Sequence, residues 1–308
     1  MAPGLALYAV LSTCYNGEGA RCSRSPTPKP RPLCREPRRN RWPASCVARG
    51  TDAIVAARVA ADVPHAQHGE GRRFVIIPLG DEDRRRTFPI VNLLLIAANI
   101  LVYIYVYVLV DPARQAYILD NYVAIPREIL EGQDVPPPGP YPLWITLFTA
   151  MFLHANLIHI AGNMLFLFIF GDNVEDAFGH LQYLLFYLLS GVVATLVQAG
   201  VAVVFEGASG MVAGELGASG AIAGVLGAYL VMFPHARIRV LVGFFILFFT
   251  RLSAGIVIGV WFLLQFIPAL TSIYNVGGVA YFAHVGGFLT GVIIASILRP
   301  RPPRYAPP

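Results

Sequence analysis

Charged residues are scarce in this chain of 308 residues. They make up 13% of the sequence, and 56% of the residues are hydrophobic, whereas about 25% of a soluble domain is charged. So few polar side chains cannot cover the surface of a globular domain of this size, which excludes an ordinary soluble enzyme. The high apolar content also excludes disorder across the whole chain. The composition therefore indicates an integral membrane protein.

The apolar body of the chain lacks a basic excess as well. Residues 1–87 hold 15 of the 23 lysines and arginines and 8 of the 18 acidic residues, which gives this segment a net charge of +7. Residues 88–308 have a net charge of −2. The overall charge of +5 therefore belongs to the N-terminal segment, and we expect no nucleic-acid partner.

Cysteine is absent outside the N-terminal segment, where it occurs as Cys14, Cys22, Cys34 and Cys46. Their spacings match no compact zinc pattern, so we expect no metal site. Residues 1–87 are rich in Arg, Pro and Ala and show no sustained apolar period, which predicts a disordered basic tail. Two further interpretations stay open: an organelle targeting segment, or a mis-assigned start with the true one near Val75, so that residues 1–70 are not made.

The body contains long stretches without a charged residue, each near the roughly 20 residues that cross ~30 Å of hydrocarbon. These stretches are 88–110, 145–171, 181–205, 216–234, 252–270 and 281–298. We therefore expect a six-helix membrane domain over 88–298, followed by a short basic Pro-rich tail over 299–308. The apolar run 240–250 is short for a span, and we expect it to lie along the membrane interface. The connection 111–144 is long enough to be structured in its own right.

Arginines near the spans predict the orientation of the bundle. They precede the first span at 84–86, follow the fourth as Arg237 and Arg239, and follow the sixth within 299–304. With six spans these groups share one side, so both termini are expected in the cytoplasm. The compact body favours a bacterial inner membrane, while the tail leaves an organelle membrane open.

Four polar residues stand out inside the predicted spans, where polar groups are expensive. They are His159 and Asn163 in the second span, Ser219 in the fourth and His284 in the sixth. A structural interpretation exists for each of them. The serine lies among small residues such as Gly217, which commonly line contacts between membrane helices, and the others can form interhelical hydrogen bonds.

The topology places these polar groups at one depth. Ser219 and His284 lie near the starts of spans that both begin on the outer side. His159 and Asn163 are four residues apart, so they share one helix face toward the outer half of the second span. All four groups are therefore expected where water from outside can reach them.

Glycines predict which helices touch. Gly220 and Gly224 in the fourth span match Gly287 and Gly291 in the sixth, each pair at the small-xxx-small spacing of close membrane-helix contacts. Such a contact would bring the serine of the fourth span alongside the histidine of the sixth.

A serine beside a histidine is the minimum for nucleophilic acyl transfer. No carboxylate lies within a predicted span to orient the histidine, so the sequence predicts a dyad. The Asn163 amide, the His159 imidazole and the backbone N–H of Ser219 are suitable donors for a tetrahedral oxyanion. This chemistry requires no cofactor.

Residues 88–298 resemble the rhomboid family of intramembrane serine proteases. The matching elements are His-Ala-Asn-Leu-Ile-His-Ile-Ala-Gly-Asn at 154–163, Gly-Ala-Ser-Gly-Ala at 217–221 and Ala-His-Val-Gly-Gly-Phe-Leu-Thr-Gly at 283–291. A glycine-flanked segment with a central glutamate at 171–179 fits the family too. The order of these elements on spans two, four and six makes the resemblance specific.

The resemblance implies an all-α membrane protein, a six-helix bundle around a short central fourth helix. It implies Ser219 as nucleophile, His284 as base, and His159 and Asn163 in the oxyanion hole, with His154 as a further histidine near the site. The implied substrates are single-pass transmembrane proteins in the lipid bilayer, cut in or beside their membrane helix. The oligomeric state is not implied.

Two positions depart from the family pattern. The Trp-Arg pair of the first outer connection is missing, because Trp144 is followed by Ile145, so that connection must be anchored differently. Position 223, one turn after the serine, is Ala223 where some members place an aromatic residue against the histidine. Neither departure removes a reactive group.

Two other functions stay open alongside the protease. One is a non-catalytic rhomboid-like protein that binds transmembrane clients. The other is a transporter or channel, which would need polar residues continuing toward the inner face, whereas residues 164–170 of the second span are apolar.

Overall fold

The computed structural model describes residues 75–82, 85–136, 138–243, 247–272, 280–298 and 300. All of them belong to one of the two compact units into which the chain divides. The predictions for the tail before residue 75, and for the C-terminal tail beyond Pro300, lie outside the described residues.

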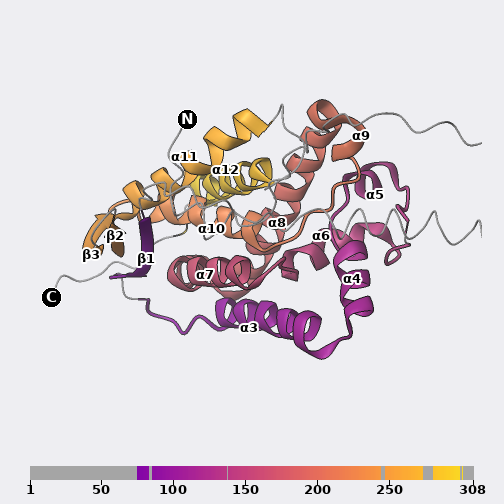
Figure 1. Cartoon of the computed structure of the whole chain (residues 1–308). Coiled ribbons are helices and arrows are strands. Elements are labelled where there is room, and N and C mark those ends of the chain that lie inside the picture. Colours follow the sequence, from indigo (N-terminus) through magenta and orange to yellow (C-terminus); the bar gives the residue numbers. More distant parts are fainter. Residues whose placement is uncertain are drawn as a thin grey trace, which may run out of the picture. The chain divides into compact units, whose positions relative to one another are not determined.

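The predicted spans appear as helices arranged in a bundle (Figure 1). They are α3 (Ile90–Ile104), α7 (Leu157–Phe178), α8 (His180–Val201), α10 (Ser219–Met232), α11 (Ala254–Ser272) and α12 (Tyr281–Leu298). π-Helical turns, Tyr105–Leu109 and Ala202–Glu206, extend α3 and α8. Four helical stretches are long and apolar enough to cross a membrane, and α10 and α11 contribute shorter apolar segments. The mostly helical membrane bundle is therefore confirmed.

The fourth helix is short and central, as predicted. α10 has 14 residues, and an unbroken run from Gly220 to Tyr229 is buried. A helix that is buried on every side must present small residues to its neighbours, and six of the 14 residues of α10 are alanine or glycine. This helix therefore forms the core around which the others pack.

The connection 111–144 is structured, as expected. It contains α4 (Pro112–Asn121) and α5 (Pro126–Glu131), and further short helical segments lead from it toward α7. Those segments are Leu143–Ile145, α6 (Thr146–Thr149) and Ala150–Phe152; α9 (Gly207–Gly210) follows α8. Asp111 caps α4 by accepting the backbone N–H groups of Ala113 and Arg114, which lowers the pKa of its carboxyl group.

The boundaries predicted for the second span, 145–171, are wrong at both ends. α7 runs over Leu157–Phe178, and the residues before it form separate short helices. The backbone is extended at Leu153 and at Asn156. The Asn156 side chain then accepts the N–H of His159 at 2.9 Å, so α7 has a helix cap of its own.

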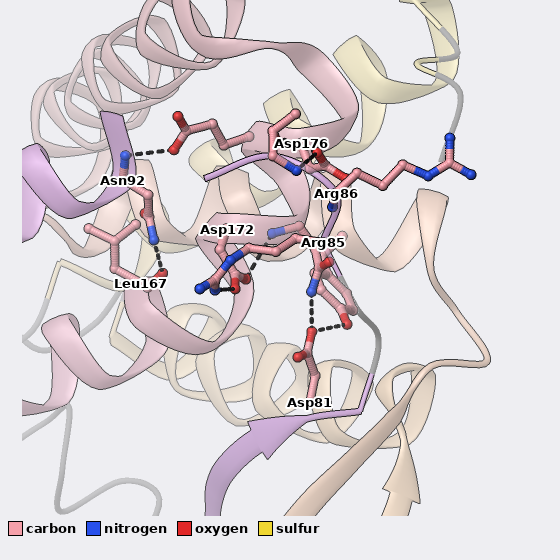
Figure 2. Close-up of polar contacts among 11 residues, drawn as sticks. Asp81, Arg85, Arg86, Asn92, Leu167, Asp172 and Asp176 are labelled. Carbon is pink, nitrogen blue, oxygen red and sulfur yellow. Dashed lines mark hydrogen bonds and ion pairs between the residues drawn. The ribbon is translucent and has the colours of Figure 1, made fainter. Parts of the chain in front are cut away.

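α7 continues beyond residue 171 because its acidic residues are paired. Arg85 Nη1 donates to Asp172 at 2.6 Å, and Asp176 accepts the backbone N–H groups of Arg86 and Thr87 at 3.1 and 2.9 Å. Figure 2 shows the segment before α3 lying over this end of α7, with Arg85 directed at Asp172. Pairing removes the cost that unpaired carboxylates would impose on an apolar helix.

A third carboxylate of α7 caps α3. Glu175 is fully buried and accepts the backbone N–H of Val91 at 2.9 Å and that of Asn92 at 2.7 Å. A negative charge at a helix N-terminus satisfies unpaired donors and interacts favourably with the helix dipole. The Asn92 side chain in turn donates to the Leu167 carbonyl at 3.0 Å (Figure 2). The first span is thereby fixed against the second.

A three-stranded antiparallel sheet lies at the end of the bundle away from α4 and α5 (Figure 1). Its order is β1 (Val75–Asp81), β2 (Arg237–Gly243) and β3 (Leu247–Ser253), with Ile77 opposite Leu241 and Val240 opposite Thr250. We expected the apolar run 240–250 to lie along the membrane interface. The described part of it forms paired strands, in which β2 buries Ile238, Val240 and Val242 and exposes Arg237 and Arg239. The location of this run along the interface stays a prediction.

β1 also corrects the predicted boundary of the N-terminal tail. Residues 75–81 pair with β2 and belong to the folded unit, although we expected disorder up to residue 87. Asp81 accepts hydrogen bonds from Tyr229 of α10, at 2.9 Å, and from Asn173 of α7. The strand was overlooked because a single edge strand buries too few side chains to give a clear period.

The contact between α10 and α12 depends on glycine, as the small-residue spacing predicted. A Cβ atom placed on Gly287 would lie 2.0 Å from the carbonyl oxygen of Gly220, and one on Gly291 would lie 1.9 Å from that of Gly224. No side chain fits at such distances. The two backbones are therefore in direct contact over one helical turn.

Gly287→Ala should force these backbones apart and lower the free energy of unfolding by roughly 1–3 kcal/mol. Thermal unfolding of the purified protein in detergent measures this change. Gly259→Ala on α11 is the matched control, since a Cβ there meets no atom within 4 Å. Equal unfolding temperatures for the two variants would contradict the close contact.

The buried Glu128 of α5 should make the stability of the folded protein depend on pH. It is 2% exposed, and burial raises the pKa of its carboxyl group above the ordinary value of 4.5, despite the N–H that Val135 donates to it. A carboxyl group whose pKa is raised by folding holds its proton more tightly in the folded state. The folded protein therefore loses stability as the pH rises from the ordinary pKa of glutamate to the raised pKa. Glu128→Gln should therefore raise the unfolding temperature at neutral pH. The gain should vanish below the ordinary pKa of glutamate, and a gain that is the same at every pH would contradict this.

Candidate active site

Ser219 and His284 meet where α10 and α12 touch. Ser219 is the first residue of α10, and His284 lies in the first turn of α12. The Nε2 atom of His284 is 2.7 Å from the Oγ atom of Ser219, which is hydrogen-bond distance. The histidine is 3% exposed and the serine is half-buried. The pair singled out in the sequence is therefore in direct contact.

The segment before Ser219 is shaped by a glycine. Gly217 has a φ of +123°, which favours glycine, and a Cβ on it would lie 2.9 Å from the His159 ring. Its N–H donates to the Ala150 carbonyl at 2.8 Å. α10 begins immediately afterwards, so the first N–H groups of the helix have no intrahelical acceptor. The serine thus lies beside free backbone donors.

His159, Asn163 and His154 form a cluster against this glycine, in which Asn163 and His154 are buried and His159 is half-buried. The position of a Cβ on Gly217 is 2.9 Å from His159 Nε2 and 3.8 Å from Asn163 Nδ2. Asn163 Nδ2 is also 2.9 Å from His154 Nε2, and the two imidazole rings are 5.0 Å apart. His154 therefore positions Asn163, which assigns it a place that the sequence left unsettled.

The connection 111–144 is anchored through backbone contacts. Ala124 and Glu215 exchange two hydrogen bonds of 2.9 Å, and the N–H of Arg127 donates to the Met211 carbonyl at 2.9 Å. These bonds tie α5 to the segment that leads to Ser219. Trp144, where the family pair is missing, is 57% exposed. We expected the anchoring of this connection to differ from the family pattern, and it consists of a short strand-like pairing between Ala124 and Glu215.

α11 supplies two neighbours of His284 that the sequence analysis did not identify. Gln265 Oε1 lies 2.8 Å from His284 Nδ1, and the Trp261 ring lies 6.1 Å from the imidazole. Four residues separate them, so they share one face of α11. A glutamine within an apolar span is itself a signal of function. Trp261 also gives His284 an aromatic contact, which the methyl group of Ala223 cannot provide.

A small cavity of about 30 Å³ lies beside Ser219. It is lined by Gly217, Gly220, Ala283 and residues of the short helices before α7. That volume holds a water molecule but not a peptide segment. Any larger molecule must displace part of the lining to reach the serine.

These features define an integral membrane protein with a polar site enclosed in its helix bundle. A family model described as "Rhomboid domain" matches residues 142–301, just over half of the chain. The chain belongs to the rhomboid family.

Curated relatives agree with this membership. Rhomboid-like protein 11, chloroplastic, of Arabidopsis thaliana is 44% identical over 77 residues, which cover 24% of this chain and 28% of that protein. RHOMBOID-like protein 6, mitochondrial, of the same plant is 33% identical over 161 residues, 51% of this chain and 44% of that protein. RHOMBOID-like protein 2 is also 33% identical over 161 residues, 51% and 43% of the two chains. The chain therefore spans less than half the length of these relatives.

Proposed function

We propose that this chain is an intramembrane serine endopeptidase that cuts transmembrane proteins in or near their membrane helix. The observation that carries the proposal is the 2.7 Å contact between Ser219 Oγ and His284 Nε2. A serine hydroxyl is a weak nucleophile unless an adjacent base takes its proton. The imidazole is already placed to do so.

The reaction follows from this geometry. Ser219 Oγ attacks the scissile carbonyl while its proton passes to His284 Nε2. The tetrahedral intermediate collapses, the C–N bond breaks, and the imidazolium gives its proton to the leaving amine. Water then attacks the acyl-enzyme carbonyl while His284 takes a proton from that water. The bond between the acyl carbon and Ser219 Oγ breaks, His284 returns the proton to the serine oxygen, and the new C-terminal carboxyl group leaves.

The oxyanion requires donors that are fixed before the reaction. We assign this role to His159, to Asn163 and to the free N–H groups at the start of α10, with Gly217 leaving room for the carbonyl oxygen. His154 holds the Asn163 amide at 2.9 Å. The supporting roles of Gly220, Gly287 and Gly291 are to keep the serine and histidine in contact.

The location of the site supports the proposed substrate class. A membrane helix protects its peptide bonds because each carbonyl is hydrogen-bonded within the helix. A substrate segment that unwinds near the membrane surface exposes a peptide carbonyl. This segment must widen the 30 Å³ cavity to reach Ser219. Such a reaction needs water, which enters from the side of the bundle that holds α4 and α5.

The proposed orientation places the sheet and both ends of the chain on the cytoplasmic side. Arg85, Arg237 and Arg239 lie at that end of the bundle, and basic residues accumulate on the cytoplasmic side of membrane proteins. A bacterial inner membrane was the expectation, but two of the plant relatives carry the names of organelles. We propose a cellular membrane with this orientation, bacterial or organellar.

Ser219→Ala and His284→Ala should each lower kcat by about 10⁴-fold or more, because nucleophile and base act as a unit. Purified protein in liposomes, incubated with a model transmembrane substrate, measures the rate. Ser190→Ala is the matched control, since this serine of α8 is also buried and, in the described part of the chain, its Oγ has no hydrogen-bond partner. A fluorophosphonate should label wild type at Ser219. Cleavage retained in either variant would exclude the mechanism, and a wild type that binds substrate without cutting or labelling would indicate a non-catalytic client-binding protein.

Asn163→Ala should lower kcat by roughly 10²-fold and change KM little, because an oxyanion donor acts mainly in the transition state. The same cleavage assay measures both constants. Asn99→Ala removes another fully buried asparagine, on α3, and serves as the control. An equal loss in both variants would indicate a packing role for Asn163.

A further inference from the structure

The imidazole of His284 is held at both of its nitrogens. Nε2 faces Ser219 Oγ at 2.7 Å, and Nδ1 faces Gln265 Oε1 at 2.8 Å. Gln265 is 3% exposed and comes from α11, a helix that contributes neither the nucleophile nor the oxyanion donors. A polar side chain buried in an apolar helix needs a partner, and here that partner is the proposed base.

The chemistry of this contact fixes where the ring proton lies. The Oε1 atom of a glutamine only accepts hydrogen bonds, so Nδ1 must carry the proton in this pair. Neutral imidazole has one ring proton, so Nε2 is then left with its lone pair directed at the serine hydroxyl. The opposite tautomer would present an N–H to Ser219 and could not take its proton.

We infer that Gln265 is a positioning residue that holds His284 in the tautomer required of a base. This inference rests on the proposed protease function and extends it from a dyad to a serine–histidine–glutamine relay of hydrogen bonds. Gln265 occupies the position relative to the imidazole that a carboxylate occupies in a Ser–His–Asp triad. A neutral amide avoids the cost of burying an ion among apolar helices.

The other side chains around the ring do not perform this task. Trp261 packs against the imidazole, but its indole nitrogen is a donor only and cannot accept the Nδ1 proton. His159 approaches from α7 on the side of Gly217, where the oxyanion is expected. Among the described residues, the recorded acceptor at Nδ1 is Gln265.

Two substitutions separate hydrogen bonding from packing. Gln265→Met keeps nearly the same shape and removes the acceptor, whereas Gln265→Glu keeps an acceptor oxygen. We expect Gln265→Met to lower kcat and the rate of fluorophosphonate labelling at Ser219 by about 10- to 100-fold, with KM changed less than about threefold. This loss is smaller than the ~10⁴ that the wrong tautomer costs in a Ser–His–Asp protease, because a neutral amide gives less charge stabilisation. Gln265→Glu should label at least about tenfold faster than Gln265→Met.

Leu264→Met is the matched control, because it places the same new side chain on the preceding residue of α11 and should leave the rate unchanged. Equal labelling rates for wild type and Gln265→Met would overturn the inference. It would also be overturned if Gln265→Glu labelled as slowly as Gln265→Met while Gln265→Glu unfolded at the same temperature as wild type. The nitrogen NMR shifts of the His284 ring, assigned with His284→Gln, give a readout that needs no activity. They should show the proton on Nδ1 in wild type and a mixture of tautomers in Gln265→Met, and a proton on Nε2 in wild type would also overturn the inference. If wild type is not labelled at all, the proposed protease function fails, and the ring shifts still test Gln265.

Discussion

The contact between the backbones of α10 and α12 is the constraint on which the site depends. Association of helices in lipid gains little from the hydrophobic effect, so it relies on close van der Waals approach. A Cβ atom placed on Gly287 would lie only 2.0 Å from the carbonyl oxygen of Gly220. One added methyl group at this contact would therefore separate the two helices. The same movement would lengthen the 2.7 Å bond between Ser219 and His284. Stability and reactive geometry therefore share one origin.

The acidic side chains of α7 and the polar groups around Ser219 differ in how their hydrogen bonds are satisfied. At the sheet end each acidic side chain of α7 has a partner, as Asp172 has Arg85 and Glu175 has the start of α3. Around Ser219, in the described part of the chain, His159 Nδ1 and Asn163 Oδ1 are buried without a hydrogen-bond partner. Buried groups that lack a partner are costly and need an explanation. Under the proposed function, the backbone of a substrate would supply the missing partners.

The sequence predicted the parts of the fold that repeat a local rule. The spacing of small residues predicted the α10–α12 contact, and the charge-free run 281–298 matches α12 residue for residue. The start of α7 was missed because a cap at Asn156, not hydropathy, ends the preceding segment. Gln265 was missed because its partner is 19 residues away on another helix, and no local pattern reports such a pair.

The arrangement of the site also explains how a bundle with so few polar residues specifies its own assembly. His159 and Asn163 come from α7, Ser219 from α10, Gln265 from α11 and His284 from α12. Each helix inserted alone would carry a polar group into hydrocarbon without a partner, at a cost of several kcal/mol for each unsatisfied group. Assembly removes part of that cost only when the helices meet in one register. The polar residues to which we assign the proposed reaction therefore also favour a single packing of the helices.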